Sequence, residues 1–136
     1  MKQKFKSMEA NELRLNNIIS YCGVPVRVSN LGNNGFETIR DNGLLYGDSD
    51  VEKYKAIPLT EEILIKTELT QCLDVFEIDQ FYTIKFVEKE SVYEFDGYYL
   101  FAHYTEYETN TLIFFVHQLQ NLYFVLKDKE LEIKLW

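Results

Sequence analysis

The stretch Thr111–Trp136 constrains the fold most, because its hydrophobic period changes twice within a short length of chain. Residues 112–116 form a continuous apolar run whose length suits a buried strand. Large apolar side chains then recur at helical spacing: Leu119, Leu122, Tyr123 and Leu126. That spacing places them on one face of an α-helix. Residues 131–135 alternate apolar and charged side chains, as a half-buried strand does. The stretch therefore predicts a strand, a helix that lies across a sheet, and a closing strand.

Turn-forming residues divide the first part of the chain into short strands rich in β-branched side chains. Cys22-Gly23 is a short hairpin connection, and Asn33-Asn34-Gly35 is a strong turn signal between two further strands. The predicted strands are 18–21, 24–29, 36–40, 44–46 and 51–57. Short strands at such close spacing predict a small, curled antiparallel sheet or an SH3-like barrel.

A helix start follows at residues 58–62, with the sequence Pro-Leu-Thr-Glu-Glu. Thr60 is a typical N-cap, since its hydroxyl can accept a hydrogen bond from a backbone N–H of the first turn. Glu61 and Glu62 suit the positive end of the helix dipole. We expect this helix to run to about Leu69 and to connect the two halves of the chain.

The second half is predicted to be mainly antiparallel sheet. Its predicted strands are 73–78, 81–87, 92–95 and 98–104. Asp96-Gly97 is a typical two-residue turn and predicts a hairpin between the last two of these strands. In that hairpin the alternate side chains Tyr99, Phe101 and His103 share one face. One face of the hairpin can pack under the C-terminal helix, and the other is left for the first half, a partner or solvent.

These elements predict an α+β protein with three parts along the chain. A disordered tail occupies 1–8, a β lobe occupies 9–58, and a lobe with a helix on a sheet occupies 59–136. Hydrophobic residues make up 46% of the chain and proline occurs twice, so the chain can bury a core. We expect the two lobes to share that core and to form one continuous domain.

The charge balance limits the kinds of partner. A net charge of −8 argues against direct nucleic-acid binding, which needs a basic surface. No apolar run reaches the roughly 20 residues that cross a bilayer, and the N-terminus lacks the apolar segment of a signal peptide. We therefore expect a cytoplasmic protein with no membrane partner, in which Cys22 and Cys72 remain reduced.

The sequence contains no motif of a known catalytic or nucleotide-binding site. The patterns GxSxG, GxxxxGK[ST], GxGxxG, HExxH and CxxC are absent. Two cysteines and two histidines have the ligand types of a zinc site but lack the paired spacing of structural zinc motifs. These are Cys22, Cys72, His103 and His117. The sequence therefore predicts no cofactor and no metal, and it favours a protein that is not an enzyme.

Two groups of side chains are candidates for an interaction surface. On the predicted helix, Phe124 points away from the apolar stripe and lies beside His117, seven residues earlier. We expect another element to cover Phe124, and an exposed aromatic–imidazole patch that suits a partner is the alternative. The candidates are His117, Gln120, Asn121 and Phe124 on the helix, and Tyr99, Phe101 and His103 on the hairpin.

Four phrases of the sequence are distinctive when taken together. They are Asn11–Leu15 (NELRL), Ile57–Glu62 (IPLTEE), Val116–Phe124 (VHQLQNLYF) and Lys129–Leu131 (KEL). In these phrases the chain resembles a family of small uncharacterised proteins encoded by gut bacteria and by the phages and mobile elements found there. The resemblance implies a single-domain protein in a context of mobile DNA, with Met8 as the natural start. It implies no activity.

The leading hypothesis is a non-catalytic protein-interaction module, an accessory factor of a phage or mobile element whose protein partner is unidentified. One alternative is a module that binds a small ligand, sugar or nucleotide on the Tyr-rich hairpin, because aromatic faces are good stacking platforms. A second alternative is an acidic mimic of nucleic acid. Self-association into a homo-oligomer is compatible with each of these.

Overall fold

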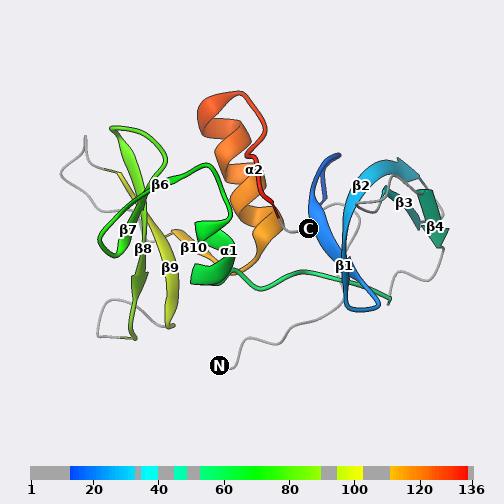
Figure 1. Ribbon diagram of the computed structural model, residues 1–136, viewed down its shortest axis with the longest axis horizontal. Helices are drawn as coiled ribbons and strands as arrows, with labels where there is room; N and C mark the ends of the chain where they lie inside the picture. Colours follow the sequence, from blue (N-terminus) through cyan, green and yellow to red (C-terminus); the bar gives the residue numbers. More distant parts are fainter. Residues whose placement is uncertain are drawn as a thin grey trace. The chain divides into compact units, whose positions relative to one another are not determined.

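The computed structural model describes residues 13–32, 35–39, 45–48, 53–89, 95–102 and 111–134. Within these ranges the chain forms two antiparallel sheets and two helices (Figure 1). The predicted α+β class is therefore confirmed, and the C-terminal helix packs on a sheet as expected. The tail predicted over 1–8 lies outside the described residues.

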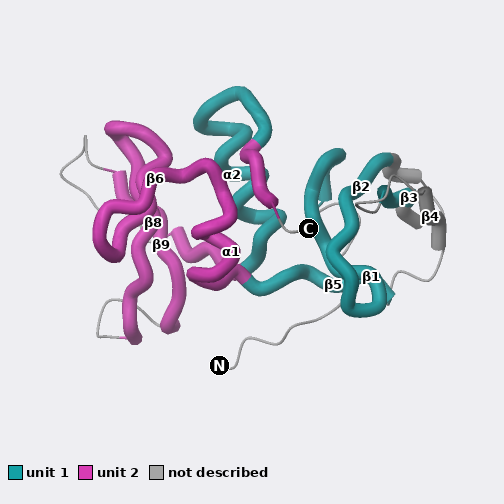
Figure 2. The backbone as a smooth tube through the Cα atoms, viewed as in Figure 1, with its two compact units in different colours: residues 1–58, 115–130, 135–136 teal, residues 59–114, 131–134 magenta. Residues whose placement is uncertain are grey.

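Two compact units divide the chain (Figure 2). The first unit consists of Met1–Pro58, Phe115–Glu130 and Leu135–Trp136, and the second of Leu59–Phe114 and Leu131–Lys134. The boundary after Pro58 coincides with the predicted one. Residues 115–130, which were predicted to belong to the second lobe, instead join the first unit. The cause is a set of hydrogen bonds between this segment and residues 14–18.

The sheet of the first unit has the strand order β4-β3-β2-β1-β5. Its strands are β1 (Ile18–Tyr21), β2 (Val24–Gly32), β3 (Gly35–Ile39), β4 (Leu45–Asp48) and β5 (Tyr54–Lys55). Successive hairpins build most of the sheet, and β5 returns to pair with β1. A register shift in β2 between Val28 and Asn30 is a bulge, which bends a strand. Among the described strands the sheet is open, so the curled sheet is observed and a closed barrel is not.

The turn between β1 and β2 follows the sequence prediction. Cys22 and Gly23 both have positive φ, at 50° and 85°, and Tyr21 pairs with Val24 across them. Two central residues with positive φ define the tight turn whose twist matches that of the flanking strands. The turn is also anchored to the segment before β5, because the backbone N–H of Cys22 donates to the carbonyl of Lys53.

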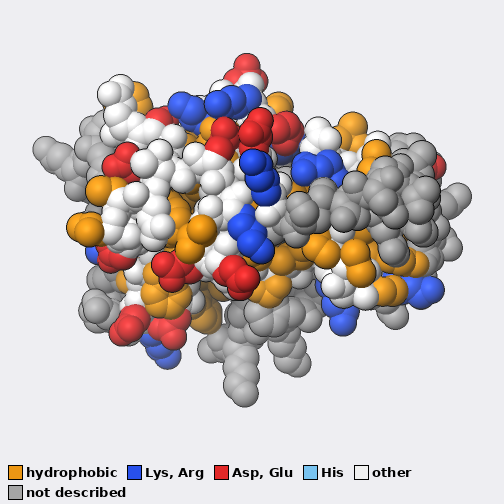
Figure 3. Space-filling view, viewed as in Figure 1, with side chains coloured by type: hydrophobic (Ala, Val, Ile, Leu, Met, Phe, Trp, Pro, Cys, Tyr) orange, Lys and Arg blue, Asp and Glu red, His pale blue; other side chains and the backbone are white. Residues whose placement is uncertain are grey.

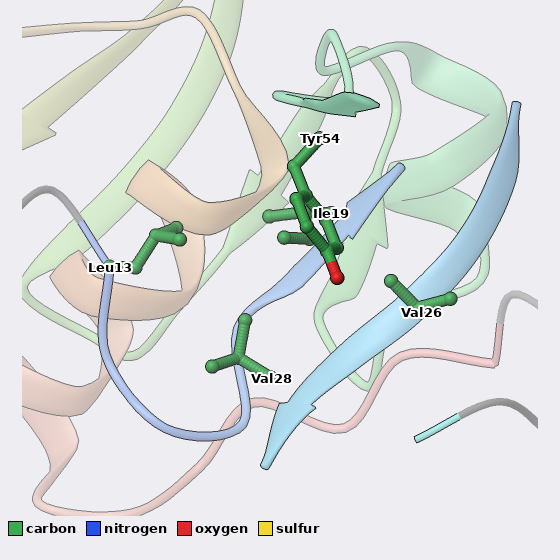
Figure 4. Close-up of a cluster of buried hydrophobic side chains, with 5 residues drawn as sticks. All are labelled: Leu13, Ile19, Val26, Val28 and Tyr54. Atoms are coloured by element: carbon green, nitrogen blue, oxygen red, sulfur yellow. The ribbon is translucent and has the colours of Figure 1, made fainter. Parts of the chain in front are cut away.

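The core of the first unit is apolar and lies against one face of its sheet. Its central side chains point toward one another (Figure 4): Leu13, Ile19, Val26, Val28 and Tyr54. Ile19, Val26 and Tyr54 come from three different strands and are fully buried. Burying a large apolar side chain contributes roughly 1.5–3 kcal/mol, so this cluster is the main stabilising element on this face of the sheet.

The sheet of the second unit has the order β10-β9-β8-β7-β6. Its strands are β6 (Thr70–Cys72), β7 (Val75–Glu77), β8 (Tyr82–Val87), β9 (Gly97–Ala102) and β10 (Thr111–Ile113). The strand predicted over 73–78 is present as β7 but was predicted to begin too early, because the chain reverses at Leu73 and Asp74. Residues on either side of these two then pair with each other as β6 and β7.

The predicted hairpin around Asp96-Gly97 is also wrong. Gly97 is the first residue of β9 and pairs with Val87, and the rest of β9 continues that pairing with β8. The other edge of β9 pairs with β10. Both edges of β9 are therefore occupied over residues 98–100. The strand predicted over 92–95 lies outside the described residues except for Phe95. Gly97 serves close packing instead, since a Cβ at this position would lie 2.7 Å from Cδ1 of Leu112.

Helix α1 (Glu61–Ile65) begins as predicted and ends earlier. The Thr60 hydroxyl accepts a hydrogen bond from the backbone N–H of Ile63 at 3.3 Å, which confirms the N-cap. The helix stops at Ile65 because Thr67 turns the chain: its hydroxyl donates to the carbonyl of Leu64 and accepts from the N–H of Leu69.

The predicted closing strand at the C-terminus is reduced to a short pairing with residues 66–68. The N–H of Glu68 donates to the carbonyl of Glu132, and the N–H of Lys134 donates to the carbonyl of Lys66. The predicted alternation is present, since Leu131 and Ile133 are buried whereas Glu132 and Lys134 are exposed. The alternating pattern therefore predicted correctly which side chains are buried, although the segment forms only one β-bridge, between Thr67 and Ile133.

Helix α2 (Val116–Lys127) is the predicted C-terminal helix. Its buried residues are Val116, His117, Leu119, Gln120 and Tyr123. Leu119 and Tyr123 belong to the predicted stripe, but Leu122 and Leu126 are only half-buried. The buried face of α2 is therefore rotated from the predicted stripe toward Gln120, a polar residue that was predicted to lie off that stripe.

Tyr98 gives the second unit a dependence on alkaline pH. Burial raises the pKa of its hydroxyl, and the nearby Glu61 carboxylate raises that pKa further. Because the native state holds this proton more tightly than the unfolded chain, the stability it contributes is complete below about pH 10 and is lost as the pH rises through the native pKa. We expect the free energy of unfolding to fall more steeply above about pH 10 in the wild type than in Tyr98→Phe. Denaturant titrations across this range test it, and equal slopes would contradict it.

Candidate functional site

The helix candidates do not form an exposed patch. His117 and Gln120 are buried, and Asn121 and Phe124 are half-buried. The His117 ring stacks on Phe115, with ring centroids 5.8 Å apart and planes 9° apart, rather than forming a patch with Phe124. Phe124 is partly covered, as expected, and the alternative of an exposed aromatic–imidazole patch is wrong because His117 is buried.

The hairpin candidates are divided between the core and the undescribed part of the chain. Tyr99 is buried, and its hydroxyl donates a hydrogen bond to the carbonyl of Phe95 at 2.9 Å. Phe101 is half-buried in β9. His103 lies outside the described residues. Tyr99 is thus closed to a stacking ligand, and the turn that would have presented these side chains on a free hairpin is absent at Asp96-Gly97.

A polar cluster joins the segment before β1 to α2. We call it the Arg14 cluster; it comprises Arg14, Asn17, Gln120, Asn121 and Glu130. At the buried end of the cluster, the Gln120 side chain forms two hydrogen bonds to the backbone of residues 16–18, as a neighbouring strand would. Its Oε1 accepts from the backbone N–H of Ile18 at 2.7 Å, and its Nε2 donates to the carbonyl of Asn16 at 3.0 Å. A primary amide is suited to this place because one side chain supplies both a donor and an acceptor.

Two asparagines continue the cluster toward its surface end. Asn17 is fully buried; its Oδ1 accepts from the backbone N–H of Arg14, and its Nδ2 donates to Oδ1 of Asn121 at 2.8 Å. The preceding Asn16 has φ 73°, a conformation that asparagine adopts more readily than most residues. Asn16 thus turns the chain, and the adjacent Asn17 binds it to α2.

The guanidinium of Arg14 closes the surface end. Its Nη1 and Nη2 atoms form a bidentate pair with the carboxylate of Glu130, and its Nε donates to Oδ1 of Asn121 at 3.2 Å. The remaining donors contact the carbonyls of Leu15 and Gln120. The same group lies over the Phe124 ring, 4.3 Å from its centroid, as a cation–π contact does.

Arg14 is therefore a structural residue. A guanidinium has five N–H donors, and the contacts above engage them within the first unit. An external phosphate or carboxylate would have to displace Glu130. Arg27 adds a further bond, from its Nη1 to the carbonyl of Asn16, and burial lowers the pKa of this arginine while Glu130 opposes that shift. The cluster binds α2 to the N-terminal segment.

Three of the four distinctive phrases of the sequence meet in this cluster. Arg14 comes from NELRL, Gln120 and Asn121 from VHQLQNLYF, and Glu130 from KEL. The side-chain partners lie more than a hundred positions apart along the chain. These three phrases therefore have a structural role in the first unit.

The strongest candidate for an interaction surface lies at one end of the second sheet, where sequence reasoning did not place it. Leu73 is 91% exposed, the most exposed large hydrophobic side chain of the described residues. Phe86 is 46% exposed, and because Lys85 pairs with Val75 it falls beside the same turn. We call Leu73, Phe86 and the exposed strand β6 the Leu73 surface. In the sequence Leu73 lies between Cys72 and Asp74. It was included in the predicted apolar strand 73–78, so the sequence did not mark it as exposed.

The backbone at Leu73 is unusual as well. Its φ is 58°, a left-handed conformation at a two-residue hairpin turn. Such positions favour glycine or asparagine, because a larger side chain costs roughly 1–2 kcal/mol. A bulky leucine that is both strained and surrounded by solvent contributes little to the fold.

Other kinds of site find no support in the part of the chain that the structure describes. No three side chains of His, Cys, Asp or Glu in those ranges come together in a way that could hold a metal ion. Neither described helix has the length and apolar character needed to cross a membrane. On the face shown in Figure 3, Asp and Glu side chains lie among Lys and Arg side chains. That face does not carry the continuous acidic array of a nucleic-acid mimic.

Comparison of the chain with known proteins leaves its family open. No family model, no curated protein and no solved structure matches it. Its function must therefore be argued from its own residues.

Proposed function

We propose that this protein is a non-catalytic protein-interaction module that docks a protein partner on the Leu73 surface. Its resemblance to proteins of gut bacteria and their mobile elements supports an accessory role in a phage or mobile element. A cytoplasmic location follows from the same proposal, since the partner would be a host or self-encoded protein. The observation that carries the proposal is the exposed, left-handed leucine at the β6–β7 turn.

Exposure and strain together distinguish this leucine from ordinary surface hydrophobic residues. A single exposed apolar side chain is common and needs no explanation. A residue held in an unfavourable backbone conformation is different, because such strain is concentrated at binding and catalytic sites. Leu73 has both features. Phe86 lies at the same end of the sheet, because Lys85 pairs with Val75, and its exposed ring packs edge-on against Tyr98 with centroids 5.3 Å apart. A projecting leucine and a rigid aromatic at one end of a sheet are suited to anchoring in a partner's pockets.

Leu73→Asn separates the docking role from folding. Asparagine tolerates positive φ and removes the exposed apolar side chain, so we expect this variant to be more stable by about 0.5–1 kcal/mol and to lose the partner. The measurement is affinity capture from a host lysate, followed by reconstitution of the captured complex from purified proteins. Chemical denaturation of the variant tests the stability part.

Val125→Asn is the matched control. Val125 is 78% exposed on α2, in the first unit, so this variant also removes one exposed apolar side chain. We expect it to keep the partner that Leu73→Asn loses. A reconstituted complex that Leu73→Asn binds as tightly as the wild type would overturn the proposal.

A further inference from the structure

Strand β6 presents free backbone groups at the edge of the second sheet. Cys72 and Val75 flank the two-residue turn, so they form the hydrogen-bonded pair that closes the hairpin. Because bonded and non-bonded pairs alternate, Gln71 and Phe76 form a non-bonded pair. The backbone N–H and carbonyl of Gln71 therefore point away from β7. Among the described strands β6 pairs with β7 only, and its residues are exposed.

This edge carries few of the features by which proteins prevent strand addition. Edges are protected by short length, lysine, proline, a bulge or an inward-pointing charge. The β6 sequence Thr-Gln-Cys contains no charge and no proline, and its pairing with β7 has no register shift, so its short length of three residues is the protection that it has. An edge with outward-pointing backbone groups can accept a further short strand.

The charges around the edge indicate what that strand should carry. Glu68 lies before β6, Asp74 lies after it, and Glu77 pairs with Thr70 on the neighbouring strand. Lys85 lies 4.0 Å from Asp74, with both side chains well exposed. An exposed pair of this kind contributes only about 0–1 kcal/mol, so a competing cation can replace Lys85 at little cost.

We infer that β6 binds an extended, basic segment of a partner protein as a sixth strand of the second sheet. This inference rests on the proposed function and specifies the partner's chemistry. The segment pairs with Gln71 at its centre through two backbone hydrogen bonds. The ladder ends with β6, because the chain reverses at Leu73 and Asp74. An apolar and a basic side chain beyond one end of the ladder reach Leu73 and Asp74, and the corresponding side chains beyond the other end reach Leu69 and Glu68.

A second copy of this chain fits the edge less well. Self-pairing centred on Gln71 brings the turn residues Leu73 and Asp74 of each copy toward Leu69 and Glu68 of the other. Asp74 then approaches Glu68 once at each end, in a chain that already has a net charge of −8. Like charges brought together at a sheet edge are destabilising. Charge therefore favours a basic strand from another protein.

The test uses the full-length protein and three synthetic peptides. The first is acetyl-Lys-Leu-Thr-Val-Thr-Leu-Lys-amide, the second has Glu in place of both Lys, and the third carries an N-methyl group on the central Val. Amide hydrogen exchange at Gln71 is the readout, because only strand addition at β6 protects that group. We expect the first peptide to slow this exchange at least about tenfold, the second to bind at least about tenfold more weakly, and the third to have no effect.

Gln71→Pro supplies the matched variant. The N–H that proline removes does not bond to β7, and proline is tolerated on edge strands, so the variant should fold. Because this N–H would bond to the added strand, the variant should no longer bind the first peptide. Unchanged exchange at Gln71 with saturating first peptide would overturn the inference. So would equal binding of the first two peptides, or protection of Gln71 that rises with protein concentration in the absence of peptide. If Leu73→Asn loses its partner in the reconstituted complex while the peptides do not bind, the proposed function stands and this inference fails.

Discussion

Replacing Gln120 by leucine is expected to lower the free energy of unfolding by about 3 kcal/mol. The leucine has a similar volume but no polar atoms, so the buried N–H of Ile18 loses its acceptor and the carbonyl of Asn16 loses one of its donors. A buried donor left without a partner costs its full desolvation energy, which is larger than the net contribution of the bond itself. Chemical denaturation monitored by circular dichroism measures the change.

Gln80→Leu is the control for this substitution. Gln80 is exposed in the bend between β7 and β8, so the same chemical change should alter stability by less than about 0.5 kcal/mol. A Gln120→Leu protein as stable as Gln80→Leu would show that the Gln120 amide does not satisfy the backbone of β1.

Leu119→Ala is expected to be at least as damaging, with a loss of about 3–4 kcal/mol. Leu119 is fully buried on α2, and its truncation removes buried methyl groups and leaves a cavity that the surroundings fill only in part. Thermal and chemical unfolding should both show the loss. The control is Val125→Ala on the same helix, where the side chain is largely exposed and the expected change is below about 0.5 kcal/mol. Equal effects of the two substitutions would contradict the observed orientation of α2.

Local signals in the sequence were sufficient for the elements whose cause is local. Cys22-Gly23 forms a hairpin because two residues with positive φ suit a tight turn, and Thr60 caps a helix because its hydroxyl reaches a first-turn N–H. The helical spacing of Leu119 and Tyr123 likewise locates α2 within a few residues. In each case the residues that carry the signal are neighbours in the chain.

The wrong predictions concern segments whose structure is determined by pairing with residues far away in the sequence. Asp96-Gly97 has the composition of a hairpin turn, but β8 and β10 occupy both edges of β9, and long-range pairing overrides the local preference. Leu73 looked like part of a strand, yet it lies at a turn in a conformation that leucine seldom adopts. Composition cannot show such strain, because it is imposed by the hairpin that the surrounding residues form.

The candidate site could be predicted least of all. Gln120 and Asn121 are polar residues on a helix, which ordinarily indicates exposure, and the sequence gives no sign that residues 14–18 lie against them. The Leu73 surface became visible only through exposure, φ and strand pairing taken together. The proposal for the function therefore depends on the structure, whereas the fold class could be predicted from the sequence.

Hydrogen exchange at the Ile18 amide tests most directly the claim that α2 and the N-terminal segment form one unit. This N–H donates to the Gln120 side chain, so the account predicts slow exchange in the wild type. In Gln120→Leu, exchange at Ile18 should rise toward the rate of a free peptide under conditions in which α2 amides remain protected. An Ile18 amide that exchanges as a free peptide in the wild type, beside a protected α2, would contradict the account.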